Sequence, residues 1–488
     1  MKKWVLAAGA AVVALGGTVA VRTATFSPDA VADGSAIKVA APVPVDTQTA
    51  ARHMSEAVQF RTVSNQDPAK NEVAEWDRLH AWLAATYPKA HAAMQQEKLG
   101  QTLVYTWPGS DPAAQPIILM AHQDVVPVTP GTEKDWKHDP FAGVIAEGAV
   151  WGRGTIDDKG QLVTMFEAMD ALAAQGFKPR RTVIVVSGHD EEVGGTGAAA
   201  AAKLLASRKV KALFTIDEGG VITSDTPVID SPAMMIGVAE KGYATLRVRA
   251  DAPGGHSSMP PAEIGTVNLA KAVVALHADQ HPMELRGPVL GMIDVLAAKA
   301  GGSTKIAAAN KWLLSSQIVK SMAKSPSSAA MLHTTVAPTM LEGSPKENVL
   351  PQTASALVNY RIAPWDSSAK VLERARAATK GLPVTVDFTE RAAREPTPVS
   401  STTSLGWQLI VAAAQAGHQG VVAAPYLVVG GTDSRSMTPV SDDVYRFAAI
   451  TLSTPETKMI HGTNEHITLA NLDSAIAFYT RLIATAAG

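Results

Sequence analysis

The sequence contains no cysteine. Disulfide bonds, thiolate nucleophiles and cysteine-based metal sites are therefore excluded together, and any metal must be held by histidine and carboxylate ligands. The chain also lacks an excess of charge of either sign, because 45 aspartates and glutamates balance its 43 lysines and arginines. A basic field that would attract nucleic acid or an anionic membrane is absent, so neither is expected as a partner of the folded body.

Two further absences concern the reaction. The G-x-S-x-G turn that presents a serine nucleophile in α/β hydrolases does not occur. The run GTGAAA at 195–200 fits the glycine-rich turn of dinucleotide-binding folds, but the acidic triplet at 190–192 stands directly before it and would repel a pyrophosphate. Water activated by a metal therefore remains as the chemistry that the sequence favours.

One uncharged run stands out at the N-terminus, from Trp4 to Val21. Lys2 and Lys3 precede it and Arg22 follows it, a pattern typical of a targeting segment with the N-terminus inside. We expect residues 1–22 to be a signal peptide or a membrane anchor, with both alternatives open. The body is then exported, periplasmic or extracellular, and meets a membrane only through this segment.

The 488 residues exceed one ordinary domain, and their patterning changes along the chain. From about residue 46 buried apolar strands alternate with helical stretches, which predicts an α/β domain with a largely parallel sheet. Tyr243–Ala250 and Ala354–Ile362 instead alternate between apolar and polar residues, as half-exposed strands do, and predict a small α+β insert. The predicted division is a linker at 23–45, a discontinuous α/β catalytic domain at 46–241 and 364–488, and an inserted lid at 242–363.

Histidine and carboxylate residues follow several of the predicted strands. In an open α/β sheet the carboxyl ends of the strands share one edge, where ligands bind, so these side chains are expected in one cleft. Asp124 can accept the second ring N–H of a ligating His122 or orient the loop. The residues are His122 and Asp124 in LMAHQDVVP, Asp157 and Asp158 in WGRGTIDDKG, Asp190, Glu191 and Glu192 in SGHDEEVGG, and Asp217 and Glu218 in LFTIDEGG.

Such an acidic cluster needs cations to compensate it. Two divalent ions balance the four negative charges of Asp157, Glu191, Glu192 and Asp217. Histidine and carboxylate donors without thiolate suit zinc, and cobalt or manganese accepts the same donors. A further histidine ligand is available in MIHGTNEHI, where spacing does not choose between the histidines at 461 and 466.

Eight stretches in order give the chain a resemblance to a known family. They are MAHQDVVPV, DPFAGVIAEGAVWGRGTIDDKG after Trp136, GHDEEVGG, IDEGG, GGHSSMPP, ENVLPQTASALVNYRI, GGTDSR and HGTNEHI. Together they resemble the dinuclear zinc carboxypeptidase and aminoacylase family, in particular the branch with carboxypeptidase S and secreted N-acyl amino acid hydrolases. The resemblance implies a catalytic domain with two metals and an inserted lid.

The resemblance also implies roles for single residues. It assigns His122, Asp157 and Glu192 to one metal, and Asp157, Asp217 and His461 to the other. Asp157 then bridges the metals, and its peptide bond to the next residue is expected to be cis. Glu191 matches the general base, which takes a proton from water and passes it to the leaving amine.

Further positions match the lid and the pocket of the family. His256 matches a lid histidine that stabilises the attacked carbonyl, in some relatives across a homodimer formed through the lid. Asn348 and Arg361 match positions that recognise a substrate carboxylate, for which arginine offers a bidentate fork. Gly431 and Arg435 match pocket positions on the catalytic side.

The sequence therefore predicts a zinc hydrolase of small peptides or N-acyl amino acids. It would cleave the amide bond between an acyl or peptidyl group and an amino acid with a free carboxylate. A dipeptidase or aminopeptidase with the same metals is the nearest alternative. An alternative of another class is a non-catalytic surface protein that binds amino acids or metal, although such a module has no need of a base at position 191.

Overall fold

The structure, a computed structural model, describes residues 2–28, 31–226, 228–229 and 231–488. The α-helices are α1 (Lys2–Ala24), α2 (Thr47–Gln59), α3 (Val73–Thr86), α4 (Pro88–Ala93), α5 (Lys159–Ala174), α6 (Thr196–Ser207), α7 (Gly265–Ala278), α8 (Pro288–Ala300), α9 (Gly302–Ala309), α10 (Lys311–Met322), α11 (Pro326–Ala330), α12 (Ser368–Ala378), α13 (Leu405–Gln415) and α14 (Leu469–Ala487). The strands are β1 (Gln95–Leu99), β2 (Thr102–Trp107), β3 (Ile117–Met120), β4 (Val144–Ala146), β5 (Ala149–Trp151), β6 (Val183–Ser187), β7 (Phe214–Asp217), β8 (Ile222–Thr223), β9 (Ala233–Glu240), β10 (Gly242–Asp251), β11 (Gly255–His256), β12 (Thr335–Glu342), β13 (Val349–Leu350), β14 (Thr353–Ile362), β15 (Thr385–Phe388), β16 (Val422–Val428), β17 (Val444–Arg446), β18 (Thr451–Leu452) and β19 (His466–Thr468).

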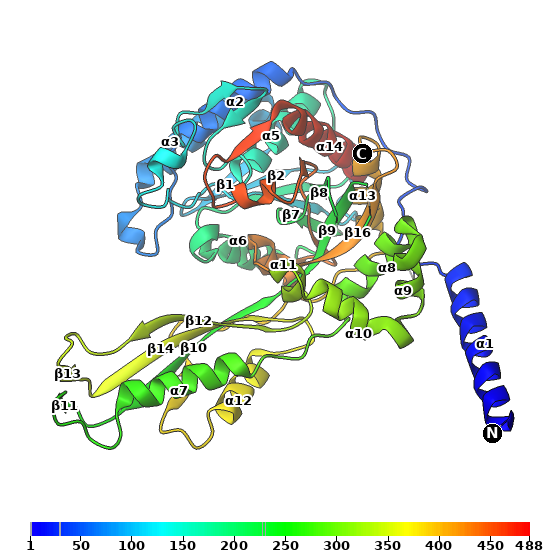
Figure 1. Ribbon diagram of the computed structural model, residues 1–488. Helices are drawn as coiled ribbons and strands as arrows, with labels where there is room; N and C mark the ends of the chain where they lie inside the picture. Colours follow the sequence, from blue (N-terminus) through cyan, green and yellow to red (C-terminus); the bar gives the residue numbers. More distant parts are fainter. Residues whose placement is uncertain (1, 29–30, 227, 230) are drawn as a thin grey trace.

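A large mixed sheet forms the centre of the molecule (Figure 1). Its strand order is β1-β2-β6-β3-β7-β17-β9-β8-β18, and β16 pairs with β9. The central neighbours β6, β3, β7 and β17 run parallel, whereas β1, β2 and β8 join through antiparallel pairs. The mixed α/β sheet expected from the sequence is confirmed.

Both faces of the central strands are covered, which explains their unbroken apolar runs. Ile117 and Leu119 of β3 point into a core shared with α5, α13 and α14. Ile118 and Met120 point to the opposite face, where they pack with Ala198 and other residues of α6. Helices, sheet and helices therefore form three layers, and the carboxyl ends of the parallel strands are fixed at one edge.

A second sheet extends away from the first in the order β12-β14-β10-β15 (Figure 1). β10 pairs with β14 over its whole length, from Gly242 opposite Ile362 to Asp251 opposite Thr353. Its inward residues form a separate apolar core with α7 and α12. The alternating patterns noted in the sequence thus belong to strands with one buried face.

The insert at 242–363 predicted from the sequence differs from this packing in two ways. The second sheet includes β15, and its core includes α12, both of which lie beyond position 363. In contrast, α8 and residues of α9, α10 and the 331–332 turn pack against β9 and β16 of the large sheet. Helices α9 and α10 meet at Asn310.

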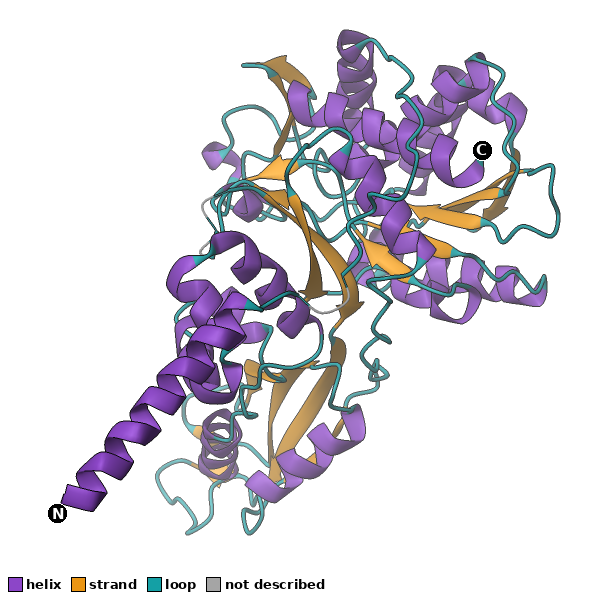
Figure 2. Cartoon of the chain, turned by 90° about the vertical axis from the view of Figure 1, so that its right-hand side faces the viewer, coloured by secondary structure: helices purple, strands orange, loops and turns teal. Residues whose placement is uncertain are grey.

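Helix α1 projects from the body (Figure 2) and meets it near α9. Asn310 donates a hydrogen bond to the hydroxyl of Thr23, and the Arg22 Nε donates to the carbonyl of Ala309. Among the helices that the structure describes, none is both long enough and apolar enough to cross a membrane.

The segment predicted as a linker begins with the last two residues of α1, Thr23 and Ala24, and its other described residues form no helix or strand. It nevertheless lies along the body, because Val31, Ile37 and Val43 pack against the main core. The indole of Trp407 in α13 also donates a hydrogen bond to the Ala32 carbonyl at 2.8 Å. The segment is therefore held on the surface rather than extended into solvent.

Candidate metal centre and substrate cleft

The acidic and imidazole residues converge at the carboxyl edge of the large sheet, as expected. β3 leads to His122, β6 leads to the turn at 190–192, and β7 ends at Asp217. The loop before α5 supplies Asp157, and the loop before β19 supplies His461. Segments more than 300 positions apart in the chain therefore contribute to one cluster.

The carboxylate of Asp157 lies between two imidazoles. Its Oδ1 is 2.9 Å from the Nε2 of His122, and its Oδ2 is 3.0 Å from the Nε2 of His461. Burial alone would raise the pKa of Asp157, but the hydrogen bonds from both histidines hold it below its usual value. The Asp157–Asp158 peptide bond is cis, as the resemblance implied. One carboxylate that faces two imidazoles is the arrangement expected of a residue that bridges two metal ions.

Each histidine has a carboxylate neighbour besides Asp157. The Nε2 of His461 is 3.1 Å from Oε2 of Glu192, whereas the Nε2 of His122 is 3.4 Å from Oε1 of Glu218. The expected grouping, in which Glu192 shares a metal with His122, is compatible with this arrangement. Ligand atoms of His122, Asp157 and Glu192 do lie within 4.8 Å of one another, but the shorter contact links Glu192 to His461.

Glu218 competes with Asp217 for the role of metal ligand that was expected of Asp217. The Oδ2 of Asp217 accepts a hydrogen bond from the backbone N–H of Ser434 at 2.8 Å, and Asp217 belongs to neither group of converging ligand atoms around His122. The next residue, Glu218, does converge on His122. Burial, followed by the charge of Asp157, raises the pKa of Glu218 to about 8. Burial raises the pKa of Asp217 and the charge of His122 opposes this rise, so Asp217 also lies near the cluster.

The donor set fits divalent cations. Among the described residues, Oε1 of Glu192 is buried without a hydrogen-bond partner, and burial raises the pKa of this carboxyl group. On the other side of the cluster, Nδ1 of His122 is 2.9 Å from the carbonyl of Asp124, which leaves Nε2 directed at the acids. Oxygen and imidazole donors without sulfur, gathered in a cluster that is mostly buried except for the exposed His461, match the ligand chemistry of zinc, cobalt or manganese.

Asp124 fixes the turn that carries two of the acids. Its side chain accepts hydrogen bonds from the backbone N–H of Glu191 at 3.1 Å and of Glu192 at 3.2 Å. The hydroxyl of Ser64 donates to the same carboxylate at 2.6 Å. Asp190 is bound to the first turn of α6, where it accepts from the N–H groups of Thr196 and Gly197. Both aspartates therefore hold the loop in place.

Glu465, for which the sequence predicted no role, connects the loop of Asp157 to the loop of His461. Its Oε1 accepts hydrogen bonds from the backbone N–H groups of Gly154, Ile156 and Asp157, at 2.9 to 3.1 Å. Its Oε2 pairs with Arg153 at 2.6 Å, and both side chains are buried. Arg153 in turn donates to the carbonyl of Gly462, beside His461, at 2.8 Å. The only sequence signal for this role was the position of Glu465 next to a candidate ligand.

An open cleft of about 860 Å³ lies against the cluster. Its lining includes six residues predicted for the site, namely Glu191, Glu192, Arg361, Gly431, Arg435 and His461. Burial raises the pKa of Glu191 well above its usual value. This volume admits a small peptide or acyl amino acid, and the candidate base faces it.

The cleft also has basic residues that the sequence did not single out. Arg391 and Arg394, on the loop after β15, line it together with Lys203 of α6. They stand in no motif and belong to no periodic segment, so only the folded chain places them at the site.

His256 and Asn348 lie at the far end of the second sheet. His256 belongs to the short two-stranded sheet of β11 and β13, where it is exposed, and Asn348 immediately precedes β13. Arg361 pairs with Tyr243 at the opposite end of β10 and β14. Because ten residues of extended strand span about 30 Å, this chain does not bring its own His256 to its own cleft.

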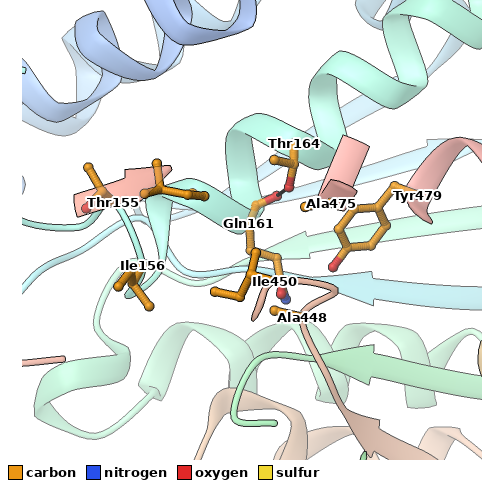
Figure 3. Close-up of a pocket in the computed structure, with 10 residues that line it drawn as sticks. Thr155, Ile156, Gln161, Thr164, Ala448, Ile450, Ala475 and Tyr479 are labelled. Carbon is orange, nitrogen blue, oxygen red and sulfur yellow. Dashed lines mark hydrogen bonds between the residues drawn. The ribbon is translucent and has the colours of Figure 1, made fainter. Parts of the chain in front are cut away.

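A second cavity lies behind the loop of Asp157 (Figure 3). Its volume is about 10 Å³, room for a single water molecule at most. The side chains of Gln161 of α5 and Tyr479 of α14 line it. It is too small for a substrate, so the cleft beside Glu191 is the candidate binding site.

The sequence matches the family described as Peptidase family M20/M25/M40 over residues 118–485. It is 32% identical to probable carboxypeptidase S-like 2 of Dictyostelium discoideum over 440 residues, which cover 89% of this chain and 84% of the relative. It is 37% identical to N-fatty-acyl-amino acid synthase/hydrolase PM20D1 of Homo sapiens over 392 residues, 78% of this chain and 76% of the relative. Among solved structures, the M20 family metallo-carboxypeptidase Sso-CP2 from Sulfolobus solfataricus has a similar fold, with a TM-score of 0.66 at 18% identity over 90% of this chain and 99% of that chain.

Proposed function

Because the chain belongs to peptidase family M20/M25/M40, we propose that it cleaves the amide bond between an acyl or peptidyl group and an amino acid with a free carboxylate. It is a metal-dependent amide hydrolase, related to a carboxypeptidase S-like protein and to an N-fatty-acyl-amino acid synthase/hydrolase. The observation that carries the proposal is the Asp157 carboxylate between the imidazoles of His122 and His461, beside the cleft. A non-catalytic binding protein is set aside.

Two metal sites that share Asp157 account best for the contacts. One consists of His122, Asp157 and Glu218, and the other of Asp157, Glu192 and His461. Zinc is the proposed metal, since these donors are imidazole and carboxylate groups alone. When bound, the metals would polarise the amide carbonyl and make water easier to deprotonate.

Different residues of the chain are proposed for proton transfer and for substrate binding. Glu191 faces the cleft from the turn that Asp124 holds, so it can take a proton from the attacking water. It returns this proton to the leaving nitrogen, as a general base that becomes a general acid. Its raised pKa, caused by burial, matches this alternation between protonated and ionised states.

Recognition of the substrate carboxylate is proposed for Arg361, and Arg435 and Gly431 line the same cleft. The guanidinium of Arg361 lies over the ring of Tyr243, at 5.1 Å from its centroid, which orients it. N-acetyl-leucine and N-acetyl-leucine amide test this role. Blocking the carboxylate is expected to lower kcat/KM about 100-fold or more, because two charge-assisted hydrogen bonds are lost. Equal kcat/KM values would favour the dipeptidase or aminopeptidase alternative.

The choice between Asp217 and Glu218 leads to a prediction about metal content. Glu218→Gln is expected to lose one of two metal equivalents after dialysis, because it removes a charged ligand beside His122. Asp217→Asn is expected to retain both, because its carboxylate is engaged by the Ser434 N–H. Metal analysis of the two variants side by side makes the comparison. The reverse result would restore Asp217 as the ligand.

We propose that the second sheet with α7 and α12 forms a lid that pairs with the lid of a second copy. The edge strand β12 exposes Met340 and Leu341, and α7 exposes Val267 and Val274. Unpaired strand edges and apolar surface of this kind favour association. In such a homodimer the partner subunit's His256 would reach the cleft, whereas the His256 of the same chain lies far from it.

A mixing experiment checks this dimer. His256→Ala and Glu191→Gln are each expected to be nearly inactive alone. Co-expressed, they form mixed dimers with one complete site, so activity is expected to return to roughly a quarter of the wild-type value. Activity no higher than the sum of the single variants would mean that His256 does not act across a dimer.

We also propose that the N-terminal segment directs the chain out of the cytoplasm. Two lysines, an uncharged run and Arg22 support this, in the order typical of export signals. A reporter enzyme fused after residue 45 is expected outside the cytoplasm. Its retention with the cytoplasmic fraction would contradict the proposal.

A further inference from the structure

The cleft carries more positive charge than one substrate carboxylate needs. Three carboxylates line it, and two of them, Glu191 and Glu192, belong to the proposed metal centre and its base. The third, Asp433, is buried, and burial raises its pKa well above the usual value. The cationic lining residues are Lys203, Arg361, Arg391, Arg394 and Arg435.

Two of these arginines share one aromatic ring. The guanidinium of Arg361 and that of Arg391 each lie 5.1 Å from the ring centroid of Tyr243. A guanidinium that packs on a ring uses its face, so its N–H edge stays available to an anion. Tyr243 therefore holds two cationic groups at the cleft in defined positions.

Arg391 and Arg394 also lie against the turn of the metal centre. A Cβ atom at Gly194 would be 3.4 Å from Nη2 of Arg394 and 3.5 Å from Nη2 of Arg391. Arg394 donates a hydrogen bond to the carbonyl of Gly194, two positions after the ligand Glu192. Both guanidinium groups are thus placed beside the turn that carries Glu191 and Glu192.

No carboxylate among the described residues lies within ion-pair distance of Arg361, Arg391 or Arg394. Arg435 has only a distant one, Glu240 at 3.8 Å, which already binds Arg446 at 2.7 Å. Burial lowers the pKa of Arg361, and the charge of Arg391 lowers it further. A bound anion such as the α-carboxylate of a substrate would reduce this repulsion.

We propose that the cleft selects amide substrates with a second carboxylate, and that Arg391 and Arg394 bind this group. The inference rests on the proposed function and names its substrate class. The second carboxylate comes either from the side chain of a released acidic amino acid or from the far end of a dicarboxylic acyl group. Both sources present the same chemistry to the two guanidinium groups.

Two matched substrate pairs separate these sources. N-acetyl-glutamate and N-acetyl-glutamine differ in charge on the amino acid side chain, and N-succinyl-leucine and N-succinamoyl-leucine differ in charge on the acyl group. With the metal-loaded wild type, we expect the acidic member of one pair to have a kcat/KM about 10-fold to 100-fold higher than its neutral partner. The pair that shows the preference identifies the source.

Variants connect the preference to the arginines. Arg391→Ala is expected to bring the ratio of acidic to neutral kcat/KM close to one. Because Arg391 is exposed, its truncation should leave the thermal unfolding midpoint within a few degrees of the wild type. Arg247→Ala, an exposed arginine further along β10, is the control and should keep the wild-type ratio. Calorimetric titration of N-acetyl-glutamate into Glu191→Gln, with and without Arg391→Ala, gives a Kd independent of turnover.

The outcomes are distinct. Turnover of the neutral substrates with equal or higher kcat/KM than the acidic ones would overturn the second-carboxylate inference and leave the proposed function intact. Turnover of none of the four substrates by metal-loaded protein would count against the proposed function itself. A charge preference that Arg391→Ala and Arg394→Ala both leave unchanged would remove these arginines from recognition.

Discussion

Glu191→Gln is expected to lower kcat by about 10²–10⁴-fold while the metal content stays at the wild-type level. The substitution keeps the shape of the side chain and removes its capacity to accept a proton. The backbone N–H of Glu191 donates to Asp124 and its carbonyl accepts from the N–H of Gly194, so the turn is expected to remain in place. Rate measurements with N-acetyl-leucine and metal analysis on the same preparation provide the two readouts.

The matched control for this substitution is Glu263→Gln, an exposed glutamate in the loop before α7. It makes the same chemical change away from the cluster and should leave kcat unchanged. A Glu191→Gln enzyme with wild-type turnover would show that another group moves the proton. A variant that lost its metals would show instead that Glu191 is a ligand.

Asp157→Asn is expected to abolish tight binding at both metal sites and to lower kcat/KM by at least about 100-fold, since metal ions supply several kcal/mol of transition-state stabilisation. The two carboxylate oxygens of Asp157 are directed at His122 and His461 separately, so one substitution affects the ligands of both proposed metal sites. An asparagine offers one oxygen without charge. Metal content after dialysis and kcat/KM at several added metal concentrations are the measurements.

This result differs from that expected for ligands of a single site. Glu218→Gln should lose one metal equivalent, whereas Asp157→Asn should lose both. An Asp157→Asn protein that kept one metal at full affinity would contradict the bridging role.

Among the elements of the fold, the strands were predicted best from the sequence. The strands expected at Tyr243–Ala250 and Ala354–Ile362 are found as β10 and β14 with bounds that differ by at most one residue, because alternation of apolar and polar residues is typical of a strand with one buried face. Helices α8 to α11 and strand β15 were not assigned to their layers. Their apolar faces are ordinary, and only tertiary packing decides that α8 rests on β16 while α12 rests on the second sheet.

Some residues of the site were likewise predicted from the sequence, and others were not. His122, Asp157, Glu192 and His461 were found through motifs, and the structure brings all four together. The choice between Asp217 and Glu218 depends on which side chain turns towards the cluster, and adjacent positions in a motif do not specify that direction. Arg391 and Arg394 have no local pattern at all, because a chain segment after β15 carries them to the cleft.

The most direct measurement of the central claim is the metal content of the folded protein. Purified protein stripped by a chelator, reloaded with zinc and dialysed is expected to retain two metal equivalents per chain by elemental analysis, with activity recovered in parallel. Retention of no more than trace metal by well-folded protein, with no recovery of activity on reloading, would contradict the account.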